Sequence, residues 1–185
     1  MGSSLTIPLG VVIAREKIDH PWLDTRWRPV SVFLNAPPAE WRTLRRGTDI
    51  THYHAATLPL ELHRKETMAY QVNLANGEPS VYVVLREDPS FPPDRPVEVF
   101  LVTASPFEAQ AYGESGFEIV DRVPMPEPLV VLVEEFIAAH HVDEPFVKRQ
   151  RQKRQAEDEH KFGQEPINVL RERMRSKNQG GGSNG

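Results

Sequence analysis

The chain has 185 residues, a formal net charge of −4 at pH 7 and no cysteine. The lack of cysteine excludes disulfides, thiolate zinc sites, iron–sulfur clusters ligated by this chain and cysteine nucleophiles. The slightly acidic balance excludes a global attraction to nucleic acid, and 17 prolines predict short, sharply bounded elements.

The length suits one ordinary domain with extensions. No stretch approaches the ~18–20 apolar residues that span a bilayer, and residues 1–5 lack the basic and apolar regions of a signal peptide. We therefore expect a cytoplasmic protein.

The first part of the chain predicts two strands around an aromatic loop. Residues 6–15 are rich in β-branched side chains, which is typical of a buried strand, and residues 30–34 predict a second strand. Between the two strands, prolines bound a loop that contains Trp22 and Trp27.

The middle of the chain predicts a helical turn and four strands. The helical turn covers residues 37–46 and ends at Gly47. The strands are expected at residues 53–62, 69–74, 80–86 and 97–104. Asn76-Gly77 favours the positive φ angles of a tight turn, so the second and third of these strands are predicted to form a hairpin.

The following segment predicts two helices and an edge strand. Ser105 can cap a helix that begins at Pro106 and ends near Tyr112, because its hydroxyl can accept a hydrogen bond from a free backbone amide. Residues 117–120 resemble an edge strand. Residues 127–141 predict the longest helix, because apolar residues recur three and four positions apart on one face.

These elements predict an α+β fold. An antiparallel sheet, either open or barrel-like, carries helix 127–141, and the globular domain covers residues 1–146. Residues 147–185 form a charged extension, in which residues 166–177 predict a short amphipathic helix. The glycine-rich end has no means of burying apolar surface and is expected to be disordered on its own.

Several strings of the chain carry a resemblance to a known family. They include Ile7-Pro8-Leu9-Gly10-Val11-Val12, the strings at 62–67 and 81–86, Val102-Thr103-Ala104-Ser105-Pro106-Phe107-Glu108-Ala109, and the string at 139–146. Between about residues 7 and 154 the chain resembles an uncharacterised family of short proteobacterial proteins commonly encoded beside molybdenum-dependent formate dehydrogenase genes. The resemblance implies an accessory, assembly or regulatory role in a formate dehydrogenase system, or an additional subunit. It assigns no catalytic residue.

Candidate partner-binding residues lie towards both ends of the chain. Trp22, Trp27 and Trp41 can serve as interface anchors, although a small core plug also explains them. In the extension, a basic run and an apolar stripe predict docking to a protein or, as an alternative, to nucleic acid or a membrane surface. These residues are Lys148, Arg149, Arg151, Lys153, Arg154, Ile167, Leu170 and Met174.

Three basic residues border the predicted hairpin, namely Arg64, Lys65 and Arg86. Together they can bind a carboxylate or a phosphate. Cross-strand ion pairs explain the same charges with fewer assumptions.

Two histidines in a His-x-His pair, His52 and His54, project from one face if they lie on a strand. With His63 they can form a three-ligand metal site. A half-exposed strand explains the same residues, and we assign no metal and no other cofactor.

We therefore expect a non-catalytic protein that acts by binding a protein partner. The resemblance implies that this partner is a formate dehydrogenase subunit or a maturation factor. One alternative is a metal- or anion-dependent enzyme that uses the three histidines. The other is a binder of nucleic acid or of a membrane surface through the charged extension.

Overall fold

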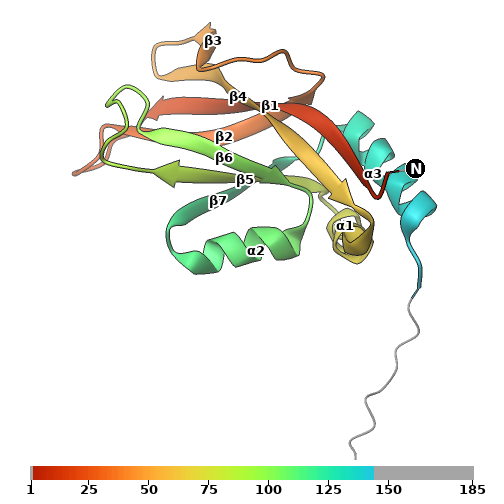
Figure 1. Ribbon diagram of the computed structural model, residues 1–185. Coiled ribbons are helices and arrows are strands. Elements are labelled where there is room, and N and C mark those ends of the chain that lie inside the picture. Colours follow the sequence, from red (N-terminus) through yellow and green to blue (C-terminus); the bar gives the residue numbers. More distant parts are fainter. Residues whose placement is uncertain (1, 144–185) are drawn as a thin grey trace, which may run out of the picture. The chain divides into compact units, whose positions relative to one another are not determined.

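The computed structural model describes residues 2–143. In this part of the chain, strands form two antiparallel sheets and helices close one side of the domain (Figure 1). The elements are β1 (Ser4–Lys17), β2 (Thr25–Leu34), β3 (Arg42–Arg46), β4 (Ile50–His63), η1 (Arg64–Glu66), α1 (Thr67–Ala75), β5 (Ser80–Glu87), β6 (Val97–Thr103), α2 (Pro106–Ser115), β7 (Glu118–Pro124) and α3 (Glu127–His140).

The larger sheet has four strands in the order β2-β1-β4-β3. Strand β1 lies at its centre, where Leu9 is paired with Leu34 of β2 and with Leu58 of β4. The register of β1 shifts by one residue against β4 after Val11 and against β2 after Val12. Such bulges bend and twist a strand, so the two ends of the long strands β1 and β4 take different directions.

The smaller sheet has three strands in the order β6-β5-β7. Its central strand β5 is buried along most of its length, as expected for the run of valines that the sequence shows there. The predicted strands at 80–86, 97–104 and 117–120 correspond to β5, β6 and β7, and the last is an edge strand as expected.

One hydrophobic core lies between the two sheets. Every second residue of β1 from Ile7 to Ile13 is buried in it and meets the alternating residues Val81, Val83 and Leu85 of β5. Burial of a side chain of this size typically contributes about 1.5–3 kcal/mol. The core therefore fixes which face of each sheet points inward, and the other face is left for solvent, for a helix or for a ligand.

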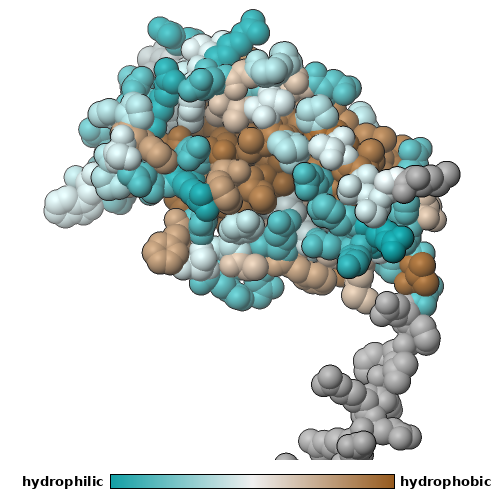
Figure 2. All heavy atoms as spheres, viewed as in Figure 1, coloured by the Kyte–Doolittle hydropathy of each residue, from teal (hydrophilic) through white to brown (hydrophobic). Residues whose placement is uncertain are grey.

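The two sheets do not close into a barrel. Strands β4 and β6 contact each other, as do β2 and β7, but the described residues form two separate hydrogen-bonded sheets. The barrel-like form of the predicted sheet is therefore wrong, while the α+β class is confirmed. Figure 2 shows apolar surface in the middle of this face of the domain, between the larger sheet and β6.

The predicted strand at residues 69–74 is wrong, because this segment is the helix α1. The predicted hairpin is wrong for the same reason: Gly77, with φ of 69°, reverses the chain between a helix and a strand. The predicted helical turn at residues 37–46 is also wrong. Its second half is the strand β3, which pairs with β4 from Thr51 to His54.

The two helices predicted after residue 104 are confirmed. Ser105 caps α2 by accepting a hydrogen bond from the backbone amide of Glu108 at 3.2 Å. Helix α3 buries Leu129, Val133 and Phe136, spaced four and three residues apart, in the core beside α1.

Two further findings concern membrane-spanning helices and the charged extension. None of the helices from residue 2 to residue 143 is long and apolar enough to cross a membrane. The charged extension, with its predicted helix at 166–177 and all its predicted docking residues from Lys148 to Met174, lies outside the described residues.

Candidate functional site

Three aromatic rings from three parts of the larger sheet form one cluster, which we call the aromatic cluster. The rings of Trp27 and Trp41 meet edge to face with centroids 5.7 Å apart, and Tyr53 lies 6.0 Å from Trp27 and 5.8 Å from Trp41. The guanidinium carbon of Arg15 lies 5.8 Å from the Trp27 ring centroid. The arrangement combines aromatic contacts with a cation–π contact.

The strand register explains why these residues meet. Arg15 on β1 is paired with Trp27 on β2 and with Thr51 on β4, so all three side chains project from one face. Tyr53 lies two residues after Thr51 and shares that face. Trp41 precedes β3 with a positive φ of 51°, and its backbone amide donates to the carbonyl oxygen of Ala55 at 3.2 Å.

A polar depression adjoins the aromatic cluster, and we call it the basic bowl. It has a volume of about 290 Å³. Its lining consists of basic side chains from β1 and β3, the turn after β3, and side chains with hydroxyl groups. The lining residues are Arg15, Lys17, Arg46, Gly47, Thr48, Asp49, Thr51 and Tyr53.

The basic residues of this end of the sheet stand out against an acidic domain. Residues 2–143 contain 12 Lys and Arg against 20 Asp and Glu, a net charge of −8. Seven of those 12 basic residues lie between Arg15 and Arg46. Within the described part of the chain, the ion pairs do not include Arg15, Lys17 or Arg46.

On the opposite face of β1, one carboxylate is shared by two arginines of β2. Glu16 lies between Arg15 and Lys17 in sequence and points to the other face, where its carboxylate binds Arg26 and Arg28 at 2.6 Å each. Hydrogen bonds from Arg28 and then Arg26 lower the pKa of Glu16 to about 2. The same pairing raises the pKa of Arg28. One buried carboxylate therefore holds two arginines in place.

The three histidines of the metal alternative do not form a site. His54 is 2% exposed, and its Nε2 lies 2.9 Å from the hydroxyl of Thr57, which itself donates to the carbonyl oxygen of Pro37. The Thr57 oxygen must then accept from His54 Nε2, so this nitrogen carries a proton and is not free to bind a metal ion. Burial is the main cause that lowers the pKa of His54.

His63 lies at the far end of β4 from the other two histidines. It follows His54 by nine positions along the strand, which corresponds to about 30 Å at ~3.3 Å per residue. Among residues 2–143 no group of three or more His, Cys, Asp or Glu side chains is arranged to hold a metal ion. The proposed three-histidine site is therefore wrong.

The predicted anion site is divided between two different elements. Arg86 on β5 binds the Glu118 carboxylate of β7 at 3.2 Å, and its guanidinium carbon lies 3.3 Å from the centroid of the Phe100 ring. At this residue the alternative of a cross-strand ion pair is the arrangement observed. Arg64 and Lys65 lie on η1, and anion binding there stays a prediction.

Trp22 is separate from the other two predicted tryptophans. It lies in the loop between β1 and β2 with 87% of its surface exposed, and none of the aromatic contacts among the described residues includes it. Trp27 and Trp41, in contrast, pack partly against the core. Partner binding by these three residues stays a prediction, with Trp22 the most accessible of them.

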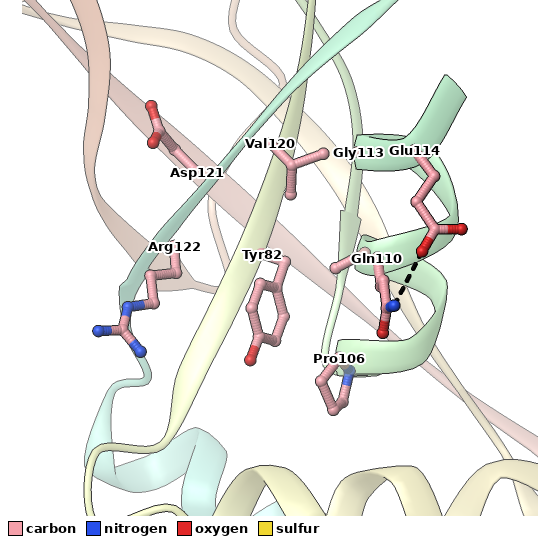
Figure 3. Close-up of a pocket in the computed structure, with 9 residues that line it drawn as sticks. Tyr82, Pro106, Gln110, Gly113, Glu114, Val120, Asp121 and Arg122 are labelled. Atoms are coloured by element: carbon pink, nitrogen blue, oxygen red, sulfur yellow. Dashed lines mark hydrogen bonds between the residues drawn. The ribbon is translucent and has the colours of Figure 1, made fainter. Parts of the chain in front are cut away.

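A second depression lies between α2 and the outer face of β5 and β7, with a volume of about 470 Å³ (Figure 3). Its floor carries Tyr82 and Val120, and Gln110 donates to Glu114 at 2.9 Å along the helix. The lining is mainly apolar with polar groups at the rim. It can accept an apolar side chain, and nothing in it favours a particular ligand chemistry.

Most of the basic bowl was not predicted from the sequence. Arg15 and Lys17 are two residues apart, as are Thr51 and Tyr53, and this spacing places each pair on one face of a strand. That signal was present in the sequence. The pairing of Arg15 with Thr51 was not, because it depends on the register between strands that lie 36 residues apart.

No curated protein and no solved structure matches this chain. A family model covers residues 8–150, which is most of the chain, and agrees with the expectation of an uncharacterised family. The chain belongs to the family described as protein of unknown function (DUF3305).

Proposed function

We propose that the protein is an accessory protein that binds a protein partner through the aromatic cluster and the arginines beside it. The observation that supports this proposal most directly is the cluster itself, in which Trp27, Trp41 and Tyr53 contact one another and Trp27 also makes a cation–π contact with Arg15. Trp, Tyr and Arg are the residue types that contribute most to binding energy in protein interfaces.

The partner surface should be acidic where it meets this end of the sheet. Arg15, Arg46 and Lys17 are exposed and have no carboxylate within ion-pair distance in residues 2–143. Carboxylates on a partner would complement them, and charge complementarity contributes mainly to specificity and to the association rate.

The proposed partner is a component of a molybdenum-dependent formate dehydrogenase or of its assembly. Support for this comes from the family strings named above and from their resemblance to proteins encoded beside formate dehydrogenase genes. The accessory role, the partner and the cytoplasmic location all belong to this proposal.

The experiment is affinity purification of the full chain from its native cells, followed by mass spectrometry and by titration of the recovered protein. The informative variant is Arg15→Glu, and Arg64→Glu is its matched control. Both arginines are exposed and have no ion pair in the described residues, but Arg64 lies on η1, outside the aromatic cluster.

We expect a formate dehydrogenase component to be recovered with the wild type and with Arg64→Glu, and to bind Arg15→Glu at least about tenfold more weakly. Recovery of no such component with the wild type would overturn the choice of partner. Equal binding by the two variants would overturn the choice of surface.

A further inference from the structure

We propose that the basic bowl is a binding site for a phosphate group, either free or carried by a small molecule. This site goes beyond partner binding, because it requires no second protein. It rests on the arrangement of Arg15, Lys17 and Arg46 around a depression with hydroxyl groups in its wall.

The first argument is the unneutralised charge. Arg15 and Arg46 are the two cross-strand neighbours of Thr51, one on each side, and Lys17 is two residues from Arg15 on the same face. Like charges gathered on one face of a sheet repel one another. An anion between the three side chains would relieve this repulsion and receive charge-assisted hydrogen bonds from several directions.

The second argument is the contrast between the two faces of β1. Arg26 and Arg28 share the carboxylate of Glu16 on one face, so the chain supplies its own anion there. On the other face, in residues 2–143, no carboxylate oxygen lies within 4.0 Å of the Arg15, Lys17 or Arg46 nitrogens. The three cations of the bowl are therefore available to an anion from outside the described residues.

The third argument is the shape of the bowl. The β3–β4 turn is fixed by the Gly47 amide, which donates to the Ile50 carbonyl oxygen at 2.9 Å, and by the Lys17 amide, which donates to the Asp49 carbonyl oxygen at 2.8 Å. These bonds hold the turn against the end of β1. The volume of about 290 Å³ exceeds the ~30 Å³ of one water molecule several-fold, so a phosphate group and a few further atoms fit.

The hydroxyl groups favour a tetrahedral oxyanion over a lone carboxylate. Thr48, Thr51 and Tyr53 line the bowl together with the three cationic side chains. A phosphate monoester has three terminal oxygens that accept several hydrogen bonds each, whereas a carboxylate has two. The number of donors around the bowl therefore matches phosphate better.

One residue of the bowl opposes an anion. Asp49 carries a negative charge in the lining and lowers the net charge of the site from three to two. Asp49→Asn should therefore raise the affinity for phosphate, by about threefold to tenfold, because a repulsive charge is removed.

The experiment is a titration of the purified full chain with inorganic phosphate and with phenyl phosphate, by calorimetry and by amide chemical shifts in NMR spectra. Arg46→Gln is the informative variant and Arg45→Gln the matched control. The two substitutions remove the same charge from neighbouring residues of β3. Arg45, however, is paired with His52 and projects from the opposite face of the sheet.

We expect saturable binding of both probes, with shifts at the amides of Thr48 and Thr51, and about tenfold weaker binding by Arg46→Gln than by Arg45→Gln. Thr51→Val should also weaken binding, whereas Thr43→Val, on the neighbouring strand outside the bowl, should not. Melting temperatures equal to that of the wild type would show that these substitutions, at exposed positions and at the half-buried Thr51, leave the domain folded.

Three results would overturn the proposal. The first is a lack of saturable phosphate binding by the wild type. The second is equal weakening of binding by Arg46→Gln and Arg45→Gln, which would indicate diffuse electrostatic attraction. The third is binding of an acidic peptide without binding of either phosphate probe. Arg15 and Arg46 belong to both proposed sites, but the phosphate site is judged by the binding of two small probes and the partner site by the recovery of a protein, so the failure of one proposal is distinguishable from the failure of the other.

Discussion

The side-chain amide nitrogen of Asn73 lies 2.7 Å from the backbone carbonyl oxygen of Ser80 and donates a hydrogen bond to it. The same nitrogen donates to the carbonyl oxygen of Ala104 at 2.8 Å, and the side-chain oxygen accepts from the amide of Ser80 at 3.0 Å. One buried side chain on α1 therefore joins the start of β5 to the segment that follows β6.

Replacement of Asn73 by alanine should destabilise the domain by about 2–4 kcal/mol, because three hydrogen bonds are lost and buried backbone groups of Ser80 and Ala104 keep no partner. Urea unfolding followed by circular dichroism measures this free energy. Asn76→Ala is the control, since Asn76 is exposed and only its backbone groups are hydrogen-bonded, the amide to Asn73 and the carbonyl oxygen to Glu78. A change below about 0.5 kcal/mol for Asn73→Ala would contradict the role assigned to this side chain.

Asn73 also explains why α1 was predicted as a strand. The buried residues Ala69, Tyr70 and Asn73 have helical spacing, but one of them is polar, and a hydrophobic pattern counts asparagine as a surface residue. Tyr and Val in the same segment favour a strand by propensity. The helix can bury Asn73 because the side-chain amide makes three hydrogen bonds in the core. These partners are known only from the tertiary structure.

The elements with apolar runs or stripes in the sequence were predictable. Strands β1, β5 and β6 agree with the predicted segments because their apolar residues are buried in a common core, and α3 agrees because Leu129, Val133 and Phe136 form a helical stripe. Strand β3 has no such pattern, since all five of its residues are exposed. Its position depends on pairing with β4.

Of the candidate site, the sequence indicated the aromatic anchors Trp27 and Trp41 but not their neighbours. Tyr53 and Arg15 join them through strand pairing. Register of this kind follows from the burial of whole strands and from bulges, which local patterns do not encode. The bowl could therefore be found only once the pairing of the strands was known.

Gly10 provides a test of the packing on the solvent side of β1. A β-carbon at this position would lie 2.5 Å from two ring atoms of Phe33 and 2.8 Å from the β-carbon of Ala36. Gly10→Ala should therefore destabilise the domain by about 1–3 kcal/mol, because the ring must move. Thermal and urea unfolding measure the loss.

A second change at Phe33 distinguishes this clash from a backbone effect. Phe33→Leu removes the ring that meets the new methyl group, so the double variant should recover part of the loss that Gly10→Ala causes in the wild-type background. Strict additivity of the two changes would argue against direct contact.

Glu16 should make the stability of the domain depend on acid pH. Its pKa is lowered to about 2 in the folded protein, from 4.5, mainly by hydrogen bonds from Arg28 and Arg26. The stabilisation is present above about pH 4.5 and is lost as the pH falls towards 2, because the unfolded chain then binds the proton more readily. The loss should amount to about 1–2 kcal/mol, since both arginines are partly exposed.

The variant Glu16→Gln tests this dependence. Its free energy of unfolding should be lower than that of the wild type at pH 7 and should change less between pH 4.5 and pH 2.5. Glu78→Gln removes an exposed carboxylate without an ion pair in residues 2–143, and it should keep the wild-type dependence. Parallel curves for the wild type and Glu16→Gln would contradict the assignment.

His54 should contribute a second pH dependence, nearer to neutrality. Burial lowers its pKa below the usual 6.5, and the positive charge of Arg42 acts in the same direction. The unfolded chain therefore binds a proton near pH 6.5 while the folded chain does not, so the free energy of unfolding should fall as the pH drops below about 6.5.

An NMR titration of the histidine ring protons measures this directly, with His54→Gln used to assign the resonance. The His54 signal should stay in its neutral form to a pH below 6.5, and its ring nitrogen should report the hydrogen bond to Thr57. His54→Gln should remove part of the stability change between pH 7.5 and pH 5.5. A midpoint at or above 6.5 for His54 would show that burial does not exclude the charged ring, because an imidazolium sharing the Thr57 hydroxyl would then be stable inside the domain.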